Sequence, residues 1–129
     1  MGPSMFDDYT VPTDKAVAEA VAAVAAAAAA RGFDVLQVHD LARIFAEKGF
    51  PSQPAAVVEI CFAQFGSMML AREPQSCLMM PCRIGAFSKD GKTYISALRP
   101  RLVGDFFPDL APMAEQGDAL MREIVDAAR

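Results

Sequence analysis

The spacing of apolar residues along this chain alternates between a helical repeat and a strand repeat, which predicts a domain built from both. The first clear element is a helix over residues 14–31, with Thr13 as its N-cap and Gly32 as the residue that ends it. Alanine dominates this segment and is the best helix former, so we expect a structural helix that lies close against a sheet. Its predicted apolar face is formed by Val17, Val21, Val24 and Ala28.

Further elements follow the first helix in the order strand, helix, strand, helix, hairpin, helix. The hairpin is the best marked of them, because Asp90-Gly91 between two apolar runs is typical of a tight turn. The predicted segments are a strand at 5–11 before the first helix, a strand at 33–39, a helix at 41–48 capped by Asp40, a strand at 56–61, a helix at 62–72, hairpin strands at 78–88 and 93–98, and a helix at 112–128.

This order predicts a single α+β domain over residues 5–129, with a mixed β-sheet, strand-helix crossovers, a C-terminal hairpin and a final helix. Strands joined through a helix favour parallel crossovers, so we expect strands 33–39 and 56–61 to run parallel. A chain of 129 residues buries a core without disulfide or metal staples. Residues 1–4 are interpreted as a possible tag remnant, with Met5 as the natural start.

Composition excludes some classes of partner. The net charge is −4 and no cluster of Lys and Arg forms a basic face, so we expect no nucleic acid partner and no binding to a membrane surface. The Ala- and Val-rich residues 16–30 are too short and too weakly apolar for a membrane span. The first ten residues lack the order of a signal peptide, which predicts a cytoplasmic protein with reduced cysteines.

Soft sulfur ligands are concentrated in one stretch, Cys77-Leu-Met-Met-Pro-Cys82-Arg83, with Cys61 and the only histidine, His39, elsewhere. Parallel strands would bring His39 and Cys61 to the same edge of the sheet, within contact distance on strands about 4.8 Å apart. A helix begins directly after Cys61, and a helix N-terminus favours the thiolate form of a cysteine. Strand alternation places Cys82 on the core face and Arg83 on the opposite one.

Plain structural roles fit the same residues. Cys61 and Cys82 also read as small buried side chains, His39 as a surface or capping residue, and Arg83 as the partner of a surface carboxylate. Glu59 shares a strand face with Cys61 and is a carboxylate that would orient His39. A structural disulfide is not expected from three cysteines in a reducing compartment.

Metal binding has a weak basis in the sequence. One histidine and no Cys-x-x-Cys pair do not make a regular zinc site, and no cofactor is expected. Copper(I) accepts two or three soft ligands, which leaves an alternative site at Cys77, Cys82 and Met80.

A set of ordered landmarks from Asp34 to Val125 resembles the domain of unknown function 302 family. The resemblance implies a small α+β fold of the TATA-binding-protein-like class, often a homodimer, without an established activity. Phe62-Ala63 departs from the usual Asn-Pro after the first cysteine, and Met80 replaces a usual leucine. The landmarks are His39-Asp40, Lys48-Gly49, Cys61, Met80-Pro81-Cys82-Arg83 and Asp90-Gly91.

Three hypotheses of function follow from these residues. The first is a thiol pocket that binds a small ligand or handles sulfur, with Cys61 as a thiolate, His39 as its proton partner, and Cys82 with Arg83 as the opposite wall. The second is the copper(I) site, and the third is a dimeric interaction module without catalysis. Whether the protein is an enzyme is left open.

Overall fold

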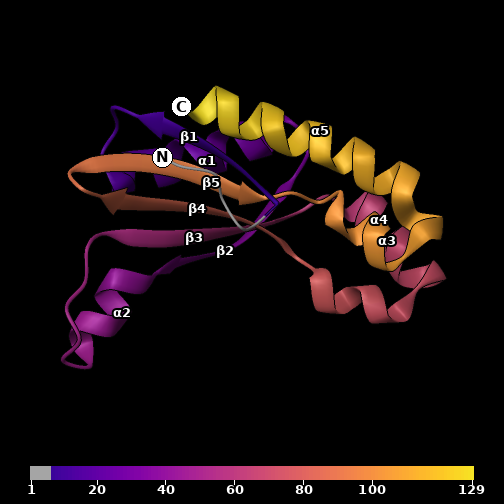
Figure 1. Ribbon diagram of the computed structural model, residues 1–129, viewed down its shortest axis with the longest axis horizontal. Coiled ribbons are helices and arrows are strands. Elements are labelled where there is room, and N and C mark those ends of the chain that lie inside the picture. Colours follow the sequence, from indigo (N-terminus) through magenta and orange to yellow (C-terminus); the bar gives the residue numbers. More distant parts are fainter. Residues whose placement is uncertain (1–6) are drawn as a thin grey trace.

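The computed structural model describes residues 7–129 and arranges them in two layers, a five-stranded sheet and two long helices that cover one of its faces (Figure 1). The strands are β1 (Asp8–Thr13), β2 (Asp34–Asp40), β3 (Ala55–Cys61), β4 (Cys82–Lys89) and β5 (Lys92–Leu98). The helices are α1 (Val17–Ala30), α2 (Leu41–Glu47), α3 (Ala63–Arg72), α4 (Leu102–Phe106) and α5 (Ala111–Ala128), with 3₁₀ turns η1 (Pro74–Met79) and η2 (Pro108–Leu110).

The sheet has the strand order β1-β5-β4-β3-β2, and every neighbouring pair is antiparallel. The predicted single α+β domain is confirmed, but the parallel pairing of β2 with β3 is wrong. The connection at residues 41–54 is long enough for a crossover. Its helix α2 nevertheless buries no residue and projects beyond the sheet, so the chain returns along β3 as a wide hairpin (Figure 1).

Alternation along the central strands explains why helices cover only one face. On β3, Ala56, Val58 and Ile60 are buried, whereas the intervening residues are partly exposed. An antiparallel sheet that packs one face and leaves the other open shows this period of two. The buried face therefore carries the core, and the long helices α1 and α5 pack on that face.

The alanine-rich segment forms α1, which lies against the sheet as predicted and also against α5. The predicted N-cap at Thr13 is wrong, because Thr13 ends β1 and the helix begins at Val17 with Ala16 as its N-cap. Ala20, Val24 and Ala28 are fully buried there, because small side chains let the helix axis approach its neighbours closely. Within residues 7–129 no helix is long and apolar enough to cross a membrane.

Two local predictions, the hairpin turn and the strand before it, have different outcomes. The hairpin turn is confirmed, with positive φ at both Asp90 and Gly91, as a tight turn between twisted strands requires. The strand expected over residues 78–88 begins only at Cys82, because η1 precedes it. The interpretation of residues 1–4 as a tag remnant lies outside the described residues.

Gly104 is the point where α4 approaches the first turn of α5. A Cβ at Gly104 would lie 2.9 Å from Cα of Ala111, and backbone atoms cannot rotate away. We predict that Gly104→Ala lowers the free energy of unfolding by about 1–3 kcal/mol, the usual cost of overpacking, measured by urea denaturation. Gly85→Ala is the matched control, because a Cβ there would lie 3.8 Å from the Ser96 carbonyl oxygen, an ordinary contact. Equal stability of the two variants would contradict the prediction.

Candidate functional site

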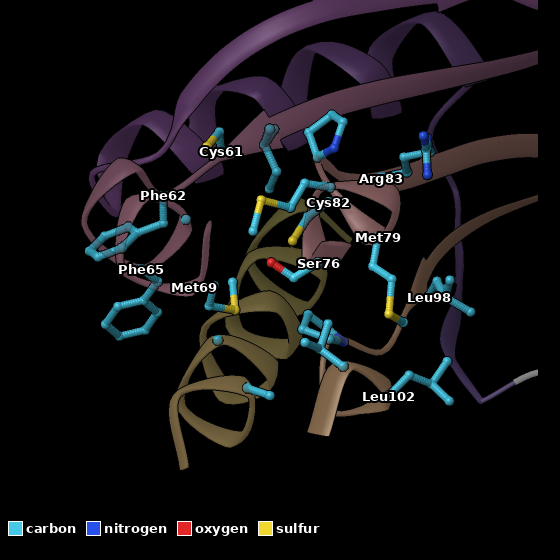
Figure 2. Close-up of a pocket in the computed structure, with 18 of the residues that line it drawn as sticks. Cys61, Phe62, Phe65, Met69, Ser76, Met79, Cys82, Arg83, Leu98 and Leu102 are labelled. Carbon is cyan, nitrogen blue, oxygen red and sulfur yellow. The ribbon is translucent and has the colours of Figure 1, made fainter. Parts of the chain in front are cut away.

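A cavity of about 360 Å³ lies at the edge of the sheet where β3 and β5 end and β4 begins. Its walls come from α3, η1, the first residues of β4, the segment that leaves β5, α4 and one side of α5 (Figure 2). The walls are mostly hydrocarbon and sulfur. The site therefore belongs to the end of the sheet that lies away from α2 (Figure 1).

One end of the cavity is aromatic. Phe33, directly before β2, packs on Phe62 with ring centroids 5.1 Å apart, and Phe62 packs on Phe65 at 4.9 Å. Both pairs are tilted, which is a favourable arrangement for aromatic rings. Figure 2 shows Phe62 and Phe65 together on one side of the cavity.

Sulfur atoms from several segments line the cavity, those of Cys61, Cys82, Met69, Met79 and Met80 among them. The predicted strand over residues 78–88 would place Met79 and Met80 on opposite faces, with only one of them available to a site. That expectation is wrong because Met79 closes a 3₁₀ turn, where strand alternation does not apply. More sulfur atoms therefore line the cavity than strand alternation predicts.

The two cysteines of the cavity differ in their surroundings. Cys82 packs against the main core, as predicted from its position in β4. Burial, and to a lesser degree the neighbouring Cys61, raise the pKa of Cys82 to about 11, so its sulfur is a neutral thiol at pH 7. Cys61 ends β3 beside Gly66, where an added Cβ would lie 3.4 Å from its Sγ.

Ser76 is the polar residue that the sequence did not single out. Its side chain is fully buried, lines the cavity, and its Oγ has no hydrogen-bond partner in residues 7–129. Figure 2 shows the hydroxyl among the side chains that line the cavity. Nothing in the Gln75-Ser76-Cys77 sequence marks this serine, since its burial depends on η1 folding under α3.

Two arginines line the cavity with different partners. Arg99 is held by Asp118 of α5 through two hydrogen bonds, of 3.1 Å from Nε and 2.6 Å from a terminal nitrogen. Arg83, whose side chain is 53% exposed, lies 3.7 Å from Glu59. The prediction that Arg83 pairs with a surface carboxylate is confirmed, but that distance is longer than a hydrogen bond.

His39 is not part of this site, which corrects the predicted pairing with Cys61. The register sets His39 opposite Val57, whereas Cys61 lies opposite Asp34. Four residues of strand, about 13 Å, separate the two positions on β3. His39 Nε2 instead lies 2.9 Å from a carboxylate oxygen of Glu59, the carboxylate that we expected beside it.

The residues proposed for copper(I) are divided by the structure. Met80 and Cys82 line the cavity, whereas Cys77 is exposed and is not among the lining residues. Residues 7–129 contain no group of three His, Cys, Asp or Glu side chains that would hold a metal ion. All three cysteines are free.

We predict that Cys82 resists alkylation below pH 9. A folded-state pKa of about 11 against an ordinary 9.0 leaves its thiolate fraction about a hundredfold lower in that range. Pulse labelling with iodoacetamide, followed by peptide mass spectrometry, measures the rate at each cysteine from pH 7 to pH 11.

Exposed Cys77 serves as the internal reference in the same molecule. Because the raised pKa belongs to the folded state, the free energy of unfolding is unaffected below pH 9 and falls as the pH rises from 9 towards 11. Equal labelling rates for Cys82 and Cys77 at pH 8 would show that the thiol is not shielded.

Comparison with known proteins adds a family and a fold. The chain is similar to a crystal structure of an uncharacterized conserved protein DUF302 from Bacillus stearothermophilus, with a TM-score of 0.89 and 23% sequence identity over 98% of this chain and 100% of the other. No curated protein matches the chain. The family model for the domain of unknown function DUF302 matches residues 9–128. The chain therefore belongs to the DUF302 family.

Proposed function

We propose that this domain binds a small, mainly apolar molecule in the cavity beside Cys61 and Cys82. The observation that carries the proposal is an apolar cavity of about 360 Å³ that also contains the partnerless hydroxyl of Ser76. Apolar walls with a few placed polar groups are typical of small-molecule sites.

Both features reduce the stability of the folded chain by itself. Protein interiors are packed as densely as organic crystals, so a cavity forfeits dispersion contacts along its walls. A buried hydroxyl without a partner costs about 1–3 kcal/mol of desolvation. A ligand with an apolar body and one hydrogen-bonding group offsets both costs at the same place, which favours binding over a simple packing defect.

The predicted thiol pocket is retained in a changed form, without His39. Cys82 contributes a neutral thiol to the wall, and Cys61 contributes the second sulfur next to the start of α3. Sulfur is polarisable and adapts to irregular apolar shapes. The two cysteines, with the methionines around them, therefore contact the ligand as soft packing surfaces.

The test is a titration of the purified protein with N-phenyl-1-naphthylamine, an uncharged dye that fluoresces in apolar surroundings. We expect saturable binding of one dye per chain, displaced by other apolar molecules of similar size. Absence of saturable fluorescence would overturn the proposal.

Ser76→Ala is predicted to make the protein more stable and to weaken its preference for a ligand with a hydroxyl group. Removal of the buried orphan hydroxyl raises the free energy of unfolding by about 1 kcal/mol. It also removes the hydrogen bond to a ligand, so the affinity ratio of 1-naphthol to naphthalene, measured by dye displacement, falls about fivefold.

Ser67→Ala is the matched control, because Ser67 on α3 is exposed, bonds to the Gln64 carbonyl and does not line the cavity. It is expected to change neither quantity. A ratio that stays the same in Ser76→Ala would show that Ser76 does not meet the ligand.

A second candidate function is self-association through the outer edge of β2. β2 ends the strand order, and Val35, Leu36 and Val38 on it are 39%, 53% and 42% exposed. Phe45 and Phe50, in the segment that follows, are also exposed. An uncovered strand edge is a template for pairing with another strand.

The partner that we propose at this edge is a second copy of the chain. Two identical strands that pair antiparallel are related by a twofold axis, so both copies use the same surface, the outer edge of β2. The arrangement would extend the sheet across both copies and set the exposed apolar side chains of β2 beside those of the partner strand.

We predict that the protein is a dimer at micromolar concentrations and that Leu36→Lys makes it a monomer, measured by light scattering after size exclusion. Leu70→Lys on α3 is the control, since Leu70 is similarly exposed, at 46%, but lies outside β2. A monomeric wild-type protein would contradict this second function and leave the first intact.

A further inference from the structure

We infer that the ligand of this cavity is an amphipathic carboxylate, an apolar molecule with a single acidic group that pairs with Arg83. The inference rests on the proposed function, because it names the chemistry of the molecule that occupies the same cavity. Its basis is the unequal state of the two arginines in the cavity wall.

The charge of Arg99 is already paired within the protein, which lowers its capacity to attract a ligand anion. Asp118, only 1% exposed, accepts from two of its nitrogens, and this pairing neutralises a charge that would otherwise be costly to bury. Arg122 also approaches Asp118, at 3.4 Å, so the carboxylate is saturated from both sides. The pair is therefore part of the wall.

Arg83 has that capacity. Its guanidinium carries five N–H donors, and none forms a hydrogen bond to another side chain in the part of the chain that the structure describes. Its nearest acid, Glu59, has one carboxylate oxygen occupied by His39 at 2.9 Å and the other 3.7 Å from Arg83 Nε. A planar guanidinium with free donors matches a carboxylate in a two-bond arrangement.

The positions of the groups along the cavity match a molecule with two different ends. Figure 2 shows Arg83 on the side of the cavity opposite Phe62 and Phe65. Ser76 adds a hydrogen-bonding group within the same cavity. A carboxylate at Arg83 leaves the hydrocarbon of the ligand against the aromatic rings, whereas a second charge at that end would be buried without a partner.

The experiment compares octanoate with octan-1-ol, which share a hydrocarbon chain and differ in charge, by displacement of N-phenyl-1-naphthylamine. We expect Arg83→Gln to weaken octanoate about tenfold and to leave octan-1-ol within about twofold, since a hydrogen bond to a charged group exceeds a neutral one. Lys89→Gln, a charge removal on the same strand outside the cavity, is the control and leaves both affinities unchanged.

Glu59→Gln is expected to change the octanoate affinity in the opposite direction to Arg83→Gln. It removes the carboxylate that competes for Arg83, so octanoate is expected to bind more tightly while octan-1-ol is unchanged. Circular dichroism of each variant checks that the fold is retained.

The outcomes distinguish failure of the carboxylate assignment from failure of apolar ligand binding. If octan-1-ol and the dye bind but Arg83→Gln leaves the octanoate affinity unchanged, or weakens both molecules equally, the carboxylate assignment is overturned and apolar ligand binding stands. If the wild-type protein binds neither molecule and no dye, the proposed function itself fails.

Discussion

Antiparallel strand order is the constraint on which the site depends. In such a sheet the end of one strand lies beside the start of the next. β3 ends at Cys61, β4 begins at Cys82 and β5 ends at Leu98, so these three strand termini lie at the same end of the sheet. The segments attached to those ends wrap around the cavity. His39 lies at the other end of β2, and the same alternation keeps it out of the site.

Local patterns predicted the elements but not their directions. The alanine-rich helix, the Asp90-Gly91 turn, the Asp40 cap and the core face of Cys82 depend on residues close in sequence, and each was predicted correctly. Parallel and antiparallel strands have the same side-chain period, so apolar spacing does not distinguish them. The connection at residues 41–54 is long enough for parallel or antiparallel pairing of β2 with β3. The observed pairing is antiparallel, and α2 in this connection buries no residue.

The site was predicted in part for the same reason. Cys61, Cys82, Arg83 and Met80 do line one cavity, because β3 and β4 are neighbours. Ser76 and the aromatic cluster were missed, since their arrangement depends on how η1 and α3 fold against segments from β5 and α5. No spacing rule reaches across such distances in sequence. The 3₁₀ turn also brings Met79 and Met80 to the cavity together, which a strand does not allow.

The two proposed functions, ligand binding and self-association, are compatible, and one residue connects the two proposed surfaces. Phe33 lines the cavity and directly precedes β2, the strand whose outer edge we propose for the second copy. Phe33 is only 6% exposed and packs on Phe62, so a change in the start of β2 reaches the aromatic end of the cavity without an intermediate residue. If strand pairing fixes this segment, the ligand meets an aromatic wall that is already ordered, and its binding costs less conformational entropy. Thermodynamic linkage then requires that the ligand strengthen the dimer by the same factor.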